Sequence, residues 1–357
     1  MASLAKTLLV KGITLVFVLI GVLVLLAFIM GASGLSDNIL RSILILEIQE
    51  FRQQLIRQGI QDPAEIERII IEYNRTRAQA LGLDKSWEYR LPQLILNLLF
   101  LDLGTSRTLQ SSWGSNKVFD LIIERLPNTI ILTTTGVALT ALVGIWIGLY
   151  IGSNVGSRID RVISILSAAS YALPLWFVGL VLILALAYAP KILWGVQIFP
   201  PGGMVSVPPP KEPLAYFLDV MWHLSLPMIA SFIAFFGSWA YTTRNIVLSI
   251  SQEDFVNFAR AKGLSEDIVR RRYILRPSLP PILTSLILSL AGSISGYIIT
   301  ERVFNWPGMG SLYYSAITAL DEPVIFALTY VFTLVYIVAR FTLEILYVVV
   351  DPRIRLS

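Results

Sequence analysis

Long stretches without charged residues constrain this chain more than any other feature of its sequence. A helix needs about 20 apolar residues to cross the hydrocarbon core of a bilayer. Five uncharged stretches exceed that length, at residues 12–36, 126–157, 162–190, 220–243 and 277–300. A sixth, 323–339, is interrupted by Arg340 and Glu344 and resumes to Val350. The sequence therefore predicts an all-α integral membrane protein with six transmembrane helices.

The composition excludes most other classes of protein. Hydrophobic residues make up 55% of the chain and charged residues only 15%, against about 25% in soluble domains. The chain has no cysteine, which excludes disulfides, thiolate metal sites and cysteine nucleophiles, and its single histidine excludes a histidine metal cluster. We expect neither a metal site nor a nucleic-acid partner.

Two further apolar segments do not fit a membrane span. Residues 192–210 are rich in proline and glycine, which is typical of an irregular loop, and residues 91–101 are too short. The first span could be a cleaved signal peptide. Its apolar run from Ile13 to Met30 is longer than a usual signal core, however, and no clear cleavage site is present. We therefore expect an uncleaved first helix.

The distribution of basic residues predicts the orientation of the spans. The short loops on one side of the membrane, after the third and fifth spans, hold only Lys191, Lys211 and Arg302. Thirteen basic residues fall on the other side, and these are Lys6, Lys11, Arg158, Arg161, Arg244, Arg260, Lys262, Arg270, Arg271, Arg272, Arg276, Arg353 and Arg355. Both termini are expected in the cytoplasm of a multi-pass cell-membrane protein.

This orientation divides the chain into three regions. Residues 1–31 would hold the cytoplasmic N-terminus and the first helix, and residues 32–126 an extracytoplasmic helical segment. Residues 127–357 would form a five-helix core with a cytoplasmic loop at 251–277. Long segments cross a membrane regardless of their charge, so the mixed charges of residues 32–126 do not oppose an outside location.

The outer segment has helical periodicity. Apolar stripes join Leu44, Ile48, Phe51 and Leu55, and then Ile66, Ile70 and Tyr73. Asp62, Pro63 and Glu65 supply the cap, first-position proline and acid of a helix start, and this helix is expected to end near Gly82. The segment could pack on the membrane core or serve as a docking platform for an external protein. Asn74-Arg75-Thr76 is a possible glycosylation site, although such tripeptides also arise by chance.

The cytoplasmic loop 251–277 has the most informative sequence. A helix from Asp254 would place Phe255, Phe258 and Ala259 on one face and Lys262 on another. Gly263 could end this helix because glycine accepts the left-handed conformation, and a second helical turn could begin at Ser265. Two short helices on the membrane surface would make a shape that another protein could grip. A plain loop that only anchors orientation is the alternative.

This loop resembles the signature D-Y-V-x-x-A-R-A-K-G-L of permease subunits of binding-protein-dependent ATP-binding-cassette importers, in their dipeptide/oligopeptide branch. The matching residues are Asp254, Phe255, Val256, Ala259, Arg260, Ala261, Lys262, Gly263 and Leu264. The resemblance implies that the loop 254–272 docks on the ATPase subunits. Phe258, Ser265 and Glu266 of this loop are expected to take part, together with the matching residues. The wider family's E-A-A triplet is Asn257-Phe258-Ala259 here, and its I-x-L-P is Tyr273-Ile274-Leu275-Arg276.

Further segments resemble the same branch, in the same order, along nearly the whole chain. They are residues 81–84, 102–106, 124–129, 173–179, 223–227, 301–310 and 351–355. Leu101 replaces a glycine of the branch. Residues 36–80 are less like the family, and Arg340 stands at a position that is usually uncharged, one helical turn before Glu344, with which it can pair.

Four residues are candidates for a gate or for the pathway, namely Pro174, Trp176, Pro227 and Glu301. A proline removes a backbone hydrogen bond, and such a break is tolerated where it is buried or lines a cavity. A kink without a gating role is the alternative. His223 is expected to be a hydrogen-bonded residue at the start of the fourth span.

The resemblance implies an importer in which an extracytoplasmic binding protein delivers a peptide-class solute. This chain and a second permease subunit, expected as a heterodimer, would form the pathway in the lipid bilayer. Two ATPase subunits would bind ATP and Mg²⁺. No G-x-x-x-x-G-K-[ST] sequence occurs here, so the chain is expected to bind no cofactor and to be no enzyme itself.

Several alternatives stay open at this point. The same machinery could import oligosaccharides, nickel or glutathione. The absence of cysteine and the isoleucine-rich outer segment fit a prokaryotic, archaeal or thermophilic source, which raises the oligosaccharide alternative. An ion-driven secondary transporter would show internal repeats and a midplane acid, which we do not find in spans one to five. A membrane scaffold would not need the pattern of the inner loop.

Overall fold

The computed structural model describes residues 2–350, and it describes no side chains for residues 2–8, 90, 91 and 346–350. The side chain of Lys6 therefore lies outside the described part. So do residues 351–355, which include Arg353 and Arg355 of the predicted inner set.

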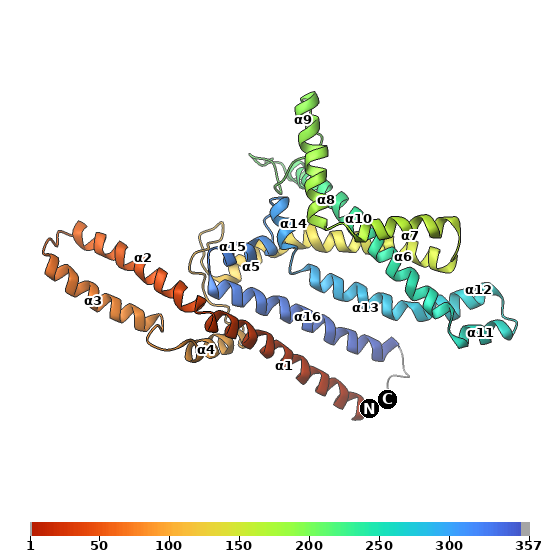
Figure 1. Cartoon of the computed structure of the whole chain (residues 1–357), viewed down its shortest axis with the longest axis horizontal. Coiled ribbons are helices and arrows are strands. Elements are labelled where there is room, and N and C mark those ends of the chain that lie inside the picture. The colour runs from red at the N-terminus through yellow and green to blue at the C-terminus, as the bar shows by residue number, and fades with distance from the viewer. Residues whose placement is uncertain (1, 351–357) are drawn as a thin grey trace. The chain divides into compact units, whose positions relative to one another are not determined.

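Between residues 2 and 350 the chain is helical apart from loops and one isolated β-bridge, so the predicted all-α class is confirmed (Figure 1). The α-helices are α1 Ala2–Ala32, α2 Leu35–Arg57, α3 Pro63–Ala80, α4 Trp87–Leu99, α5 Val118–Thr129, α6 Thr135–Ser153, α7 Arg158–Tyr171, α8 Leu175–Leu182, α9 Ala189–Trp194, α10 Pro213–Ser251, α11 Asp254–Ala261, α12 Glu266–Ile268, α13 Arg276–Ser293, α14 Ile298–Val303, α15 Met309–Thr318 and α16 Glu322–Val350. Three π-helical segments, η1 Ile130–Thr134, η2 Ile183–Tyr188 and η3 Val269–Leu275, join successive α-helices without a break.

Six helical stretches of the described chain are long and apolar enough to cross a membrane, as predicted. They are Leu9–Ala32, Val118–Ser153, Leu175–Trp194, Pro213–Ser251, Glu266–Ser293 and Glu322–Ile345. The count depends on apolar length alone, which explains why it could be predicted from the sequence.

Several predicted boundaries were wrong. The second span begins at Val118, before the uncharged stretch, because Asp120, Glu124 and Arg125 continue its helix outward. The stretch 162–190 is divided at Pro174, where α7 has ended and α8 begins. The fifth span ends at Ser293, because the next residues form a turn that contains Gly296 at φ +75°.

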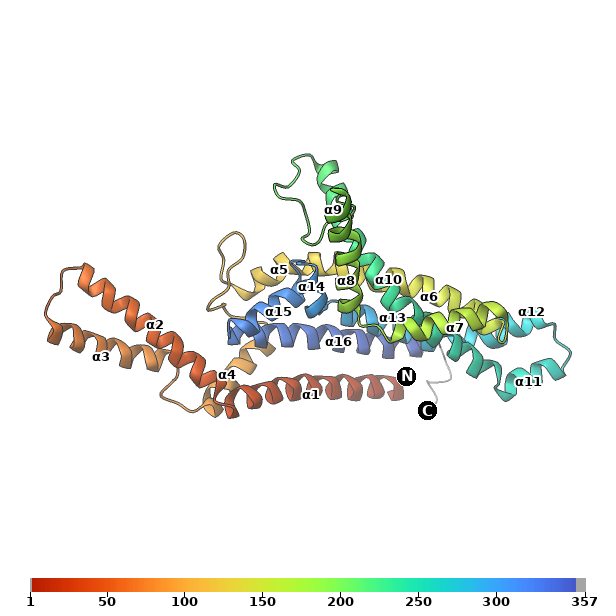
Figure 2. The ribbon, with the colours of Figure 1, turned by 45° about the horizontal axis from the view of Figure 1, so that its top comes forward.

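One compact unit consists of residues 2–12, 120–315 and 334–350. Its centre is α10, which packs along α6 and α7 (Figure 2). A stripe of glycines on α6 lets it approach α10 closely. A Cβ added at Gly148 would lie 2.7 Å from the Ala240 carbonyl oxygen, and one at Gly152 would lie 2.8 Å from Val247 Cβ. Small residues at such contacts are typical of helices that pack within a membrane.

The other compact unit consists of residues 13–119 and 316–333. Within it α2 and α3 form a hairpin, in which Phe51 stacks on Tyr73 with ring centroids 4.2 Å apart. Arg77 donates two hydrogen bonds to Glu47, at 2.6 and 2.8 Å, and these bonds hold the pKa of Glu47 below its ordinary value.

The predicted start of the second outer helix is confirmed. Asp62 accepts a hydrogen bond from the Ala64 N–H at 2.9 Å, and Pro63 is the first residue of α3. The helix ends at Ala80, and Gly82 follows at φ +71°, which fits the predicted end near this glycine. Asn74 lies exposed in the middle of α3.

Candidate functional site

Helix α11 lies in the loop between the fourth and fifth spans and begins at Asp254, as predicted. Gly263 follows its end at φ +77° and donates a hydrogen bond from its N–H to the Arg260 carbonyl at 2.9 Å. The Leu264 N–H reaches back to the Ala259 carbonyl at 3.4 Å. These bonds cap the helix, so the predicted glycine stop is confirmed.

One side of α11 is fully packed. Val256 is 0% exposed and Ala259 is 2% exposed. They share a buried cluster with Val247 of α10 and with Val269 and Ile274 of η3. Burial of these side chains holds α11 against the inner ends of two spans.

The opposite side of α11 carries two exposed phenylalanines. Phe255 is 45% exposed and Phe258 is 63% exposed. The Lys262 ammonium lies over the Phe258 ring, 4.7 Å from its centroid. The predicted faces were therefore wrong in two respects. Lys262 shares the face of Phe258 because it stands one turn further on, and Ala259 points to the interior.

Exposed charges surround this aromatic face. Arg260 donates a hydrogen bond to Glu266 at 3.1 Å, and Arg270 donates one to Asp267 at 3.2 Å. Asp254, Ala261 and Ser265 are also exposed. Ser265 is the N-cap of α12, although its side chain makes no capping hydrogen bond. Exposed pairs of this kind contribute little stability, so these charges are available to a partner.

The sequence suggested a short second helix in this loop, but the helix is long. It begins at Glu266 and runs through α12, η3 and α13 to Ser293. Pro277 stands at the start of α13, where the π-helical segment η3 precedes it and accommodates the missing backbone donor. Helix α11 is therefore connected to the fifth span by only Lys262 to Ser265.

The predicted gate residues lie in different settings. Pro174 is exposed at the N-cap of α8, so it separates two helices instead of kinking one. Pro227 is buried within the continuous α10, where its ring leaves the His223 carbonyl without its helical donor. Trp176 is 39% exposed and meets Phe177 edge-on. Among the described residues, no hydrogen bond or ring contact joins these three to Glu301.

Glu301 is fully buried in α14. It accepts hydrogen bonds from Thr129 Oγ1 at 3.0 Å and from the Ser311 N–H at 2.8 Å. Burial raises its pKa to about 7, which these bonds oppose. Nearby, Trp306 Nε1 donates to the Asn128 carbonyl at 2.8 Å. Through Glu301 and Trp306, these hydrogen bonds hold the segment 128–129 against the segment 306–311. Such contacts stabilise the packing of the two segments.

Two other predicted contacts are present. His223 Nδ1 lies 2.9 Å from the Asp219 carbonyl oxygen, so the expected hydrogen bond of His223 is confirmed. Arg340 lies 3.7 Å from Glu344, which confirms that pair. Lys11 also pairs with Glu344. The sequence did not indicate that second partner, because Lys11 lies on the first helix.

The sequence did not reveal a groove between α7 and α10, in which hydroxyl and amide groups are set among mainly apolar surface such as Ile165 and Ala168. Its volume is about 860 Å³. Its hydroxyl and amide side chains are Ser164, Ser167, Tyr171, Ser238, Tyr241, Thr242 and Asn245. A signal was present, because Asp160, Ser164, Ser167 and Tyr171 recur every three or four residues and so share one helix face.

An ion pair lies at one end of this groove. Arg244 donates to both carboxylate oxygens of Asp160, at 2.5 and 2.9 Å, and the Gly156 N–H donates a further bond at 2.9 Å. Both charged side chains are largely buried. The hydrogen bonds from Arg244 lower the pKa of Asp160 to about 2. The pair therefore neutralises itself within the wall of the groove.

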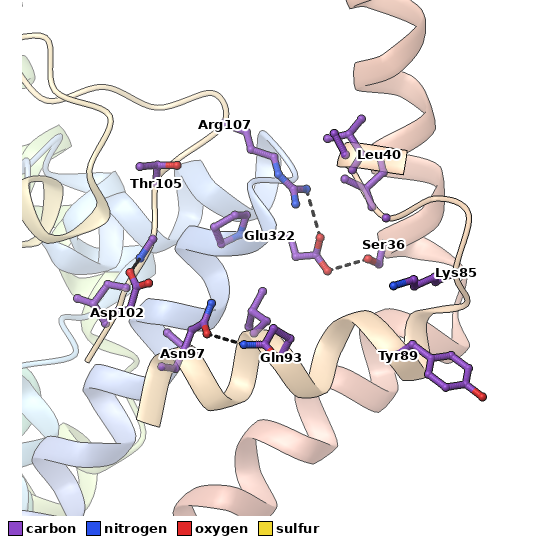
Figure 3. Close-up of a pocket in the computed structure, with 18 of the residues that line it drawn as sticks. Ser36, Leu40, Lys85, Tyr89, Gln93, Asn97, Asp102, Thr105, Arg107 and Glu322 are labelled. Atoms are coloured by element: carbon purple, nitrogen blue, oxygen red, sulfur yellow. Dashed lines mark hydrogen bonds and ion pairs between the residues drawn. The ribbon is translucent and has the colours of Figure 1, made fainter. Parts of the chain in front are cut away.

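A second cavity, of about 600 Å³, lies in the unit that contains α2 to α4 (Figure 3). Figure 3 shows Glu322 between two donors, Arg107 at 3.2 Å and the Ser36 hydroxyl at 2.7 Å. On the floor, Gln93 donates to Asn97 at 3.0 Å. The buried carboxylate of Asp321 accepts hydrogen bonds from the Ser106 hydroxyl and the Arg107 N–H. These contacts fix the loop around residues 102–108 to the start of α16.

Comparisons with known proteins relate this arrangement to membrane transport. The family described as binding-protein-dependent transport system inner membrane component matches residues 144–356. The oligopeptide transport system permease protein AppB of Bacillus subtilis is 31% identical over 258 residues, which are 72% of this chain and 77% of AppB.

Two further relatives cover more of the chain. The di/tripeptide transport system permease protein DppB of Pseudomonas aeruginosa is 30% identical over 316 residues, 84% of this chain and 92% of DppB. The glutathione transport system permease protein GsiC of Pectobacterium atrosepticum is 29% identical over 277 residues, 78% of this chain and 82% of GsiC. The family match alone spans more than half of the chain and includes α10, α11 and the fifth and sixth spans. This chain therefore belongs to the family of binding-protein-dependent transport system inner membrane components.

Proposed function

We propose that this chain is a permease subunit of an ATP-driven importer of peptides. Its family membership supports the transport role. The substrate class is supported by the names of its relatives, which are permeases for oligopeptides, for di- and tripeptides and for glutathione. Import of oligosaccharides or nickel by the same machinery is the alternative that a substrate screen would test.

The observation that carries the coupling proposal is helix α11. Its exposed Phe255 and Phe258 offer an apolar contact to an ATPase subunit, and its buried Val256 and Ala259 join that contact to α10 and η3. Exposed aromatic residues on a firmly packed base are typical of an interface hot spot. Movement of an ATPase domain would then shift the fourth and fifth spans together with α11.

The remaining parts of the proposal follow from topology. Six spans place both termini on one side of the membrane, and the basic residues favour the cytoplasm for that side. Helix α11 would lie on the same side, facing two ATPase subunits that bind ATP and Mg²⁺. The α2–α3 hairpin would lie outside, where a binding protein delivers the solute. A second, homologous permease subunit would complete the pathway as a heterodimer.

A charge on the aromatic face of α11 tests the coupling role. We expect Phe258→Asp to abolish peptide uptake and the transport-linked ATP hydrolysis of the importer, because a carboxylate in an apolar contact must be desolvated without a partner. Membrane insertion of the subunit should be unchanged. Uptake, ATPase activity and the amount of subunit in the membrane are measured on the complete importer in proteoliposomes.

The matched control is Phe100→Asp, which makes the same substitution at a phenylalanine that is 83% exposed outside α11. It should leave uptake intact. Normal uptake by Phe258→Asp would contradict the coupling role of this face. Purification of the tagged chain without ATPase subunits, across several mild detergents, would contradict the importer proposal as a whole.

A further inference from the structure

We infer that the groove between α7 and α10 is this subunit's wall of the translocation pathway, and that the hydroxyl and amide groups set in its mainly apolar surface receive the main chain of the passing peptide. The inference rests on the proposed function and adds the residues that line the pathway. It concerns a place distinct from α11, so the two can fail separately.

Two hydroxyl groups of the groove would be costly to expose to lipid. Ser238 and Thr242 lie in the fourth span and their side chains are not buried within the chain. Hydrocarbon offers them no hydrogen-bond partner, and polar residues of membrane helices therefore face the protein interior or a water-filled cavity. The groove is where α10 turns these residues toward α7, so we expect their hydroxyl groups to meet water there.

The wall of the groove also contains a hydroxyl group without a hydrogen-bond partner in the described part of the chain. This is the Oγ of Ser167, a residue that is 1% exposed. It lies where the two helices approach closely, since a Cβ on Gly237 would be 2.5 Å from the Ser167 Cα. A buried polar atom without a partner costs about 1–3 kcal/mol. A slight separation of α7 and α10 would let a water molecule or a transported group reach this hydroxyl and offset that cost.

The charges that line the groove predict its selectivity. Asp160 and Arg244 neutralise each other, and among the described lining residues Arg161 is the remaining charge. Hydroxyl groups both donate and accept hydrogen bonds. A peptide main chain alternates N–H and C=O groups, so the hydroxyl groups in this wall can pair with it, and the apolar surface between them suits side chains of varied kinds.

The far side of α7 has the opposite character. Val162 is 56% exposed and Leu166 is 55% exposed, and neither lines the groove. Exposed apolar side chains of this kind suit contact with lipid. The same short helix therefore has one face that carries the groove's polar groups and one apolar face, which supplies matched controls on the same helix.

The absence of cysteine from the chain makes a direct test practical. Single variants Ala168→Cys, Ser238→Cys and Thr242→Cys, with Val162→Cys and Leu166→Cys as controls, are assembled into the complete importer in vesicles. A charged, membrane-impermeant methanethiosulfonate is added from the side of α11. This reagent reacts with thiolate, which forms in water and not in hydrocarbon.

We expect the three groove cysteines to gain the reagent mass and to lose most peptide uptake, because the attached group fills the pathway. Saturating peptide during turnover should slow this labelling. The two control positions should stay unlabelled and active. Failure of the groove cysteines to react in an importer that transports peptide would overturn the pathway assignment, as would equal labelling of the groove and the controls. An unmodified importer without peptide uptake would instead contradict the proposed function.

Discussion

Asp160 and Arg244 stand 84 residues apart in the sequence, and their ion pair joins α7 to α10. The pair contributes to stability only while Asp160 is ionised. Folding lowers the pKa of Asp160 from its ordinary 3.8 to about 2. The ionised carboxylate therefore stabilises the fold above about pH 3.8, and this contribution is lost as the pH falls towards 2.

We expect Asp160→Asn to lower the free energy of unfolding by about 2 kcal/mol near pH 6, since a shift of one pKa unit corresponds to about 1.4 kcal/mol. The difference from the unmodified protein should shrink as the pH falls from about 4 to 2. Thermal unfolding in detergent over this pH range measures both effects. Asp84→Asn, at an exposed carboxylate, is the control. A pH-independent difference would show that Asp160 acts through packing alone.

Leu101 replaces a glycine expected in the related permeases, yet it keeps a left-handed backbone conformation that favours glycine. It has φ +63° and is 68% exposed. A left-handed conformation costs a residue with a Cβ about 1–2 kcal/mol. We expect Leu101→Gly to raise the melting temperature, because the strain is removed and little packing is lost.

The control for this substitution lies in the preceding helix. Leu96 is 48% exposed within α4, where glycine should lower stability by about 0.5–1 kcal/mol through its greater chain entropy. Melting temperatures of the purified variants give the comparison. A lower melting temperature for Leu101→Gly would mean that the Leu101 side chain contributes more by packing than its backbone loses by strain.

At the scale of elements, a short linker, Lys262 to Ser265, connects α11 to the fifth span. Gly263 stands in this linker at φ +77° and donates its N–H to the Arg260 carbonyl. Proline cannot adopt that φ and has no N–H. We expect Gly263→Pro to abolish uptake by the complete importer while the subunit still enters the membrane.

Asparagine offers the matched control at this position because it tolerates the left-handed conformation. Gly263→Asn should keep most of the uptake. Uptake, ATP hydrolysis and the amount of subunit in the membrane are measured for both variants. An equal loss of uptake with asparagine and proline would mean that this position requires the absence of a side chain, and not only the left-handed backbone conformation.

At the scale of the whole molecule, the prediction is the orientation in the membrane. Green fluorescent protein, which fluoresces in the cytoplasm, and alkaline phosphatase, which is active outside, are each fused after Ser357 and inserted between Gln58 and Gln61. We expect fluorescence from the C-terminal fusion and phosphatase activity from the α2–α3 loop, because the basic residues favour the inner side. The reverse pattern would invert the assignment of α11 to the ATPase side.

The elements themselves could largely be predicted from the sequence, because their causes are local. An apolar run longer than the bilayer is thick gives a span, the Asp62-Pro63 pair gives a helix start, and Gly263 gives a helix end. The predicted ends of these elements were wrong where the adjoining segments of the chain determine where a helix begins or ends. Charged residues extend the second span outward to Val118, and the loop before Glu266 leads directly into the fifth span.

The sequence by itself determined the membrane class, the number of spans and the inner helix with its glycine cap, since hydrophobic length and capping act between residues near in the chain. Only the tertiary structure decided which face of each helix is used. It turned Ala259 inward and left Phe258 exposed, and it buried Glu301 beside Thr129. It also placed the serines of α7 opposite Ser238 and Thr242 of α10. Apolar packing and lipid contact require the same residue types, so only the packing partners can distinguish them.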